Sequence, residues 1–177
     1  ATQMKPTNTT RTTALSLLVA AAVVLSTTVG LAGLAGAATT TDLTVSITDG
    51  DDTIAPGETT TVAVAVASAD GGVGAAELGV TSSDPGVAAI TDVSVLHGPG
   101  ITNDTVAGGG QSADVKYALA DSPDAGNVTV VELTLQAAAT GSTTVEVVQN
   151  GRTGNLVVFD ENGAGYTLDS VGNATLT

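Results

Sequence analysis

The stretch PGETTTVAVAVASADGGVGAAELGVTSSDPGV, residues 56–87, decides the fold of this chain. Residues 62–67 alternate valine with alanine, which is the period of two expected for a strand with one buried face. The pair Gly71-Gly72 interrupts the run and allows a turn that other residues make only with strain. Alternation resumes at residues 78–80. The stretch therefore predicts two strands and the corner between them, and it contains no residues suited to catalysis.

The same alternation recurs along the rest of the chain, and no stretch after residue 41 holds apolar residues at helical spacing for three turns. Turn residues separate the apolar runs, and Asn150-Gly151 is a hairpin signal. Strands are expected at residues 43–47, 62–67, 78–80, 87–96, 115–119, 131–135, 145–147, 156–159 and 166–168, with weaker candidates at 101–107 and 174–177. About nine strands at even spacing predict an all-β, antiparallel sandwich.

Residues 1–37 have the features of a signal peptide. Lys5 and Arg11 precede a 12-residue apolar run at residues 14–25, which is short for a membrane span. Small residues at 35–37 provide a cleavage pattern. An uncleaved N-terminal anchor or a filament-forming helix is the alternative, because the apolar character continues to residue 38.

The expected organisation is a signal peptide at residues 1–37, a threonine-rich lead-in at 38–41 and one sandwich domain at 42–177. The chain stops at Thr177 within the alternating pattern GNATLT, so we expect the domain to be cut short there. A domain of this length can bury a sizeable core.

The charge of the chain is strongly negative. All 18 acidic residues follow Thr41, where the only basic residues are Lys116 and Arg152. This charge repels nucleic acid and anionic lipid, which excludes both as partners. Abundant aspartate with small apolar residues favours a surface adapted to high salt over an ordinary acidic secreted protein. The absence of cysteine excludes disulfides and thiolate sites.

Residues able to carry catalysis are few. His97 is the only histidine, and although Ser94 and Asp92 are nearby, nothing orients them as a triad. Glycoside hydrolysis needs two carboxylates at a defined separation in a sugar-lined cleft, and no such pair is indicated. We therefore expect that the protein is not an enzyme.

The sequence contains no strong signal for a cofactor site. Asp49, Asp51 and Asp52 offer oxygen ligands for Ca²⁺, but their spacing does not match a 12-residue calcium loop. We expect these residues to form a solvated turn, and Ca²⁺ binding is the alternative. The same two interpretations apply to residues 160–162, where the sequence is DEN. No other cofactor is expected.

After the leader, three sequons for N-glycosylation occur, at Asn103, Asn127 and Asn173. Chance occurrence in a threonine-rich chain is the alternative explanation. Asn103 has the most loop-like setting and is the preferred site.

Several segments in fixed order resemble one family. They are PGET with the valine run after it, GGVGAA at residues 71–76, SDP at 83–85, ADVKYAL at 113–119 and GNVTVVELTLQAAATG at 126–141. Together they resemble a cohesin domain from about Leu43 to the C-terminus, and they are most similar to the secreted cohesin-domain proteins of haloarchaea.

This resemblance implies a nine-strand jelly-roll sandwich related to the carbohydrate-binding modules of cellulose-degrading systems. It also implies docking of a dockerin module, which carries its own Ca²⁺, on one sheet face. Carried onto this chain, the outward residues of the third, sixth and eighth strands form that face: Glu77, Thr81, Lys116, Thr144 and Glu146.

The expected function is therefore non-catalytic protein–protein attachment outside the cell or at its surface. A carbohydrate-binding module is one alternative, although Tyr117, Phe159 and Tyr166 are the only aromatic residues for a sugar platform. A structural subunit of a surface layer or filament is the other.

Overall fold

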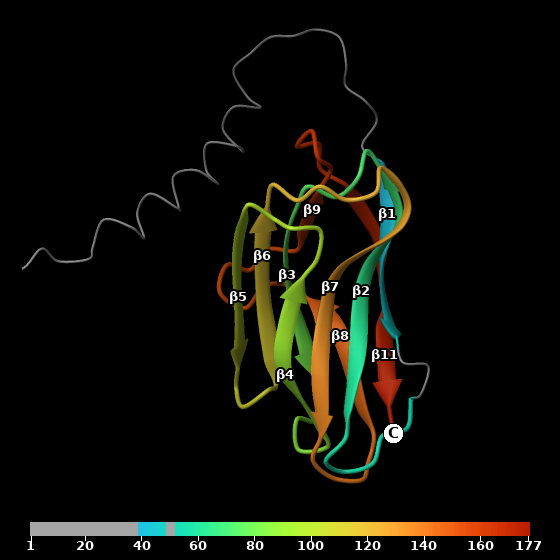
Figure 1. Cartoon of the computed structure of the whole chain (residues 1–177), viewed down its shortest axis with the longest axis vertical. Coiled ribbons are helices and arrows are strands. Elements are labelled where there is room, and N and C mark those ends of the chain that lie inside the picture. The colour runs from blue at the N-terminus through green and yellow to red at the C-terminus, as the bar shows by residue number, and fades with distance from the viewer. Residues whose placement is uncertain (1–38, 49–51) are drawn as a thin grey trace, which may run out of the picture. The chain divides into compact units, whose positions relative to one another are not determined.

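The computed structural model describes residues 39–48 and 52–177, which form two β-sheets packed face to face (Figure 1). The predicted all-β class is confirmed for these residues. The strands are β1 (Thr40–Ile47), β2 (Thr59–Asp70), β3 (Ala75–Ser82), β4 (Ala88–Val95), β5 (Ile101–Ala107), β6 (Ser112–Ala118), β7 (Ala125–Ala137), β8 (Thr143–Val148), β9 (Val157–Phe159), β10 (Thr167–Val171) and β11 (Asn173–Leu176). Within the described ranges no helix is long and apolar enough to cross a bilayer.

One sheet has the strand order β10-β1-β2-β7-β4, and the other has the order β11-β8-β3-β6-β5, with β9 also paired to β3. The prediction of a purely antiparallel sandwich is wrong at one place, since β1 and β10 pair in parallel. After β9 the chain passes from the six-stranded sheet to the five-stranded sheet. There β10 pairs with the free edge of β1 and runs in the same direction as β1.

The described residues contain eleven strands where about nine were predicted. The two additional ones are the weak candidates, β5 and β11, at the two edges of the six-stranded sheet. No residue of β5 is buried, and only Leu176 is buried in β11. An edge strand with little buried surface has a weak apolar alternation, which explains why both were difficult to predict.

The core lies between the sheets and contains the predicted valines, but the prediction of one exposed face is wrong at Ala63 and Ala65, which are each 3% exposed. Val62, Val64 and Val66 of β2 are fully buried, as are Leu78 and Val80 of β3. Each such side chain stabilises the fold by roughly 1.5–3 kcal/mol relative to exposure to water. The valine run and the strand after the corner therefore hold the two sheets together.

The corner between β2 and β3 is also confirmed. Gly71 and Gly72 have φ values of +83° and +70°, a region that favours glycine. A Cβ on Gly72 would lie 2.5 Å from the carboxylate Oε1 of Glu161. The turn therefore needs glycine for its conformation, and a side chain at residue 72 would displace the end of Glu161.

Candidate functional site

The outward-pointing residues of the six-stranded sheet form a face that we call the outer face. Strand register brings the five predicted residues together on it. Glu77 lies opposite Lys116 across β3 and β6, and Thr81 lies opposite Glu146 across β3 and β8. Thr144 precedes Glu146 by two residues on β8 and therefore points the same way.

Glu77 differs from the other four because it is covered, with only 5% of its surface exposed. Its Oε2 lies 3.0 Å from Nζ of Lys116, which is the only ion pair among the residues described. Its Oε1 accepts a hydrogen bond from Oγ1 of Thr153. Glu77 thus holds a loop on the outer face, whereas Glu146 is exposed.

The electrostatics of Glu77 reflect this position. Burial by itself raises the pKa of the carboxyl group, but the hydrogen bonds from Thr153 and Lys116 and the positive charge of Lys116 outweigh burial. The pKa of Glu77 therefore lies below its ordinary value, and the side chain is a carboxylate at neutral pH.

The covering loop comprises residues 149–156, which we call the docked loop. The predicted hairpin at Asn150-Gly151 is wrong. Both β8 and β9 pair antiparallel with β3, so they run in the same direction along one side of it. The chain leaves the sheet after Val148 and crosses the outer face. It returns at Val157 to the same side of β3, where β9 begins.

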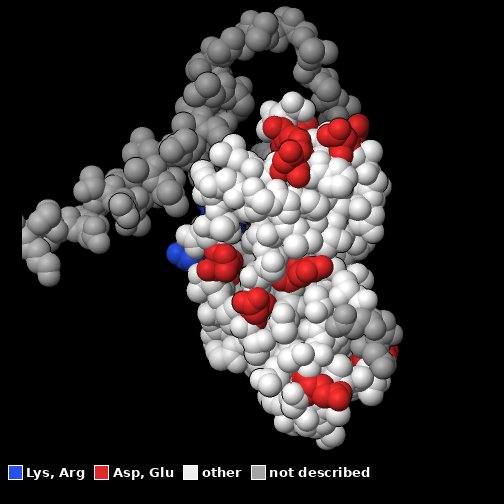
Figure 2. Space-filling model, viewed as in Figure 1, with Lys and Arg blue, Asp and Glu red and all other residues white. Residues whose placement is uncertain are grey.

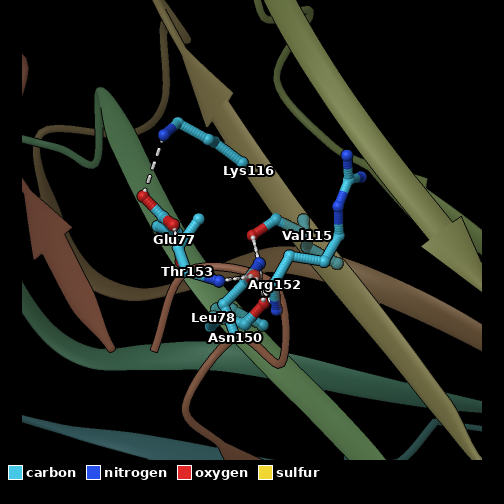
Figure 3. A network of polar contacts seen from close by, with 7 residues as sticks. All are labelled: Glu77, Leu78, Val115, Lys116, Asn150, Arg152 and Thr153. Atoms are coloured by element: carbon cyan, nitrogen blue, oxygen red, sulfur yellow. Dashed lines mark hydrogen bonds and ion pairs between the residues drawn. The ribbon is translucent and has the colours of Figure 1, made fainter. Parts of the chain in front are cut away.

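Asn150 anchors the docked loop (Figure 3). Its side chain is 3% exposed, and Nδ2 donates to the carbonyl oxygens of Leu78 and Val115 at 3.3 and 3.4 Å. Its Oδ1 accepts from the backbone N–H groups of Arg152 and Thr153. One buried amide therefore joins the loop to β3 and β6 and also fixes the turn of the loop.

Two further contacts tie the loop to the neighbouring strands. The backbone N–H of Gly151 donates to Oδ1 of Asp114 on β6 at 2.6 Å. Nη1 of Arg152 donates to Oδ1 of Asn103 at 3.1 Å and to Oγ1 of Thr105 at 3.2 Å, both on β5. The docked loop therefore spans β3, β6 and β5.

Sequence reasoning missed the docked loop, although one signal was present. Gly79 lies at an outward position inside β3, between Leu78 and Val80, and a glycine inside a strand often marks a close approach of another backbone. A Cβ at this position would lie 2.6 Å from the carbonyl oxygen of Gln149. The loop can cross the sheet here because residue 79 has no side chain.

An apolar row lies on the outer face beside the charged residues. Phe159, Ala75, Ala118 and Ile101 are register partners across β9, β3, β6 and β5, and all four are partly exposed. Val157 points the same way two residues before Phe159 and is 36% exposed. The outer face thus combines apolar side chains with charged and polar ones.

Leu119, directly after β6, is the most exposed large apolar side chain of the described part, at 71%. Its φ is +61°, in the left-handed region that is unfavourable for leucine. Its carbonyl oxygen accepts the N–H of Gly100, the residue before β5. Leu119 therefore directly follows Ala118, a member of the apolar row, in a backbone conformation that costs stability.

Two of the three sequons lie on the outer face. Asn103 is opposite Lys116 on the edge strand β5, and Asn173 is opposite Glu146 on the edge strand β11. Asn127 is exposed on β7 of the other sheet. The expectation of a loop-like setting for Asn103 is wrong, because it lies inside β5.

The candidate catalytic and metal residues do not assemble into a site within the described ranges, where no group of three metal-ligating side chains occurs. Nε2 of His97 donates to the carbonyl oxygen of Thr129 at 2.8 Å, a structural contact. Asp160 accepts the N–H groups of Asn162 and Ala164 and so stabilises a turn. Asp49 and Asp51 lie outside the described residues.

Charge is distributed unevenly over the surface. In the view of Figure 2, acidic side chains form separate patches, and basic side chains are visible only at one margin. Lys116 and Arg152, the only basic residues after residue 37, are on the outer face and in the docked loop. The outer face therefore holds all the positive side-chain charge of this part of the chain.

No model of a known protein family matches the sequence, and no curated protein matches it. Solved structures do match. A type II cohesin domain from the cellulosome of Acetivibrio cellulolyticus has a TM-score of 0.56 at 13% identity, covering 77% of this chain and 95% of that one. The sixth cohesin of scaffoldin B from this organism, in complex with a dockerin, has a TM-score of 0.58 at 14% identity, with coverages of 78% and 100%.

An archaeal protein is also similar. The non-cellulosomal cohesin of the hyperthermophile Archaeoglobus fulgidus has a TM-score of 0.54 at 17% identity, covering 78% of this chain and 91% of that one. Identities this low show the fold alone. The described domain has the fold of the cohesin modules.

Proposed function

We propose that this protein is an exported, non-catalytic attachment module that docks a dockerin-type protein on its outer face. The observation that carries the proposal is the composition of that face. It combines an apolar row with polar residues fixed by the docked loop, in a domain with the cohesin fold. Apolar anchors surrounded by polar groups are typical of protein interfaces.

Leu119 supports the same conclusion. A leucine that is 71% exposed at a φ of +61° contributes little to folding. Residues held in unfavourable backbone conformations concentrate at binding and catalytic sites. Together with Ile101 and Phe159, Leu119 supplies the apolar contacts that the five charged and polar residues lack.

Direct carbohydrate binding has less support. Flat aromatic surfaces are the usual platform for sugars, but Tyr117 is 3% exposed. Tyr166 uses its hydroxyl to bind the carbonyl oxygens of Asp70 and Gly72, and Phe159 is partly covered. Protein docking is therefore the better explanation of the outer face.

The test is a binding measurement on the full chain with purified dockerin modules, including the dockerin seen with the scaffoldin B cohesin. Perturbed NMR signals would map the contact. We expect them to concentrate on the outer strands β8, β3, β6 and β5. Charge reversal of the exposed Glu146 to Lys should change the affinity several-fold, because rim charges steer association.

Glu132→Lys is the matched control, since Glu132 lies on β7 in the other sheet. Docking on that other sheet, or equal effects of the two reversals, would contradict the proposed face. Binding to polysaccharides with no binding to any dockerin would replace the proposal with a carbohydrate-binding module. An intact leader in the mature protein, found by N-terminal sequencing, would favour a filament or surface-layer subunit.

A further inference from the structure

Arg152 is held in a defined place, yet its charge has no ion-pair partner among the residues that the structure describes. Its Nη1 donates to Asn103 and Thr105, which are both neutral. Neither Nη2 nor Nε forms a hydrogen bond or ion pair with any residue in the described ranges. A guanidinium group has five N–H donors, so most of its donors remain free.

An arginine without an ion-pair partner is unusual in a chain with this many acidic residues. All but two of the chain's 18 acidic residues lie in the described part, so carboxylates there greatly outnumber its single arginine. Lys116 is paired with Glu77, while Arg152 extends away from that pair (Figure 3). The loop is nevertheless fixed by the buried Asn150, so the arginine is positioned before any ligand arrives.

We propose that Arg152 is a preformed carboxylate-binding group, and that the partner presents an acidic side chain flanked by apolar ones. Nε and Nη2 lie along one edge of the guanidinium plane and match the two oxygens of a carboxylate. Apolar flanks fit because Ile101, two residues from Asn103 on the same face of β5, belongs to the apolar row. This inference rests on the proposed function and specifies the chemistry of the partner.

The experiment uses two peptide probes that differ in one group, acetyl-leucyl-aspartyl-leucinamide and its asparaginyl counterpart. The full chain contains two arginines, Arg11 and Arg152, so the Nε–H NMR signal of Arg152 is identified by its loss in Arg152→Lys. We expect the aspartyl peptide to shift that signal at roughly tenfold lower concentration than the asparaginyl peptide, at about 0.1 M salt.

Two variants test whether the preference for the aspartyl peptide depends on Arg152. Arg152→Gln should lose the preference for the aspartyl peptide. Gln136→Glu changes the net charge by the same amount from an exposed position on the other sheet and should keep the preference. Equal shifts with both peptides, no shift of the Arg152 signal, or an unchanged preference in Arg152→Gln would overturn the inference.

The outcomes also separate this inference from the proposed function. A dockerin that docks on the outer face with equal affinity for wild type and Arg152→Gln would overturn the carboxylate site and leave the function standing. Peptide binding at Arg152 without any protein docking on the outer face would overturn the function and leave the carboxylate site standing.

Discussion

Gly79 on β3 faces the carbonyl oxygen of Gln149, which would lie 2.6 Å from a Cβ placed on that glycine. The opposing atom belongs to the backbone, so it cannot rotate away as a flexible side chain would. We predict that Gly79→Ala displaces the docked loop and lowers the free energy of unfolding by roughly 1–3 kcal/mol. Urea unfolding and hydrogen exchange at the N–H of Gly151 measure the two effects.

Gly165→Ala is the control for this change. Gly165 is outside the positive-φ region, and a Cβ there would meet Phe159 at 3.6 Å, an ordinary contact. Its unfolding curve should match that of the wild type. A Gly79→Ala protein with full protection at Gly151 would show that the loop is not held against β3.

Asn150→Ala tests the anchor of the docked loop. The substitution removes two donor contacts to strand carbonyl oxygens and two acceptor contacts within the loop. Since the side chain is buried, we predict a loss of about 2 kcal/mol in urea unfolding. Asn150→Asp should lose more, because it brings a negative charge against the carbonyl oxygens of Leu78 and Val115. Equal stability of the three proteins would argue against the anchor.

The pH dependence of stability should identify Glu77. Because the pKa of its carboxyl is lowered on folding from an ordinary value of 4.5, the ionised group stabilises the fold above that value. The contribution is lost as pH falls through the lower, folded-state pKa. We predict that the stability difference between wild type and Glu77→Gln narrows below pH 4.5. Urea unfolding at a series of pH values measures it.

Thr153→Val provides the companion measurement for Glu77. It removes a hydrogen bond that lowers the pKa of the carboxyl group, so the NMR titration of Glu77 should move upward in this variant. A wild-type titration at or above the ordinary value would contradict the described pairing with Lys116.

Leu119 should show opposite effects on stability and docking. Leu119→Asn relieves part of the left-handed strain and removes an exposed apolar side chain, so the free energy of unfolding should stay equal or rise by up to about 1 kcal/mol. Docking of a protein partner should weaken, because an exposed apolar side chain next to the apolar row is lost. Calorimetry for stability and a binding titration for affinity measure the two. A clear loss of stability would mean that Leu119 serves the fold.

The strands of the core were predictable, because residues buried on one face of a strand leave a period of two in the sequence. The register of β4 against β7 shifts between Ile90 and Asp92, where two polar residues interrupt the apolar alternation of the sequence. The edge strand β5 was only a weak candidate, since its side chains have little core to face.

The docked loop depends on tertiary contacts that no local pattern encodes. Asn150-Gly151 is a hairpin dipeptide in isolation, but here the amide side chain is buried against two strands. The outward positions of Glu77 and Lys116 followed from strand alternation, whereas the burial of Glu77 depended on a segment more than seventy residues later in the chain.

The interruption between β8 and β9 separates the docked loop from the strand pairing that supports it. Both strands are held by β3 on either side of the gap, so residues 149–156 can be exchanged while the ladder that supports them stays in register. If the outer face docks a protein as proposed, substituting this one segment should change which protein it binds. Because the segment carries its own asparagine, grafting it onto another sandwich should require a glycine at the crossing point and acceptors in the places of Glu77 and Asp114.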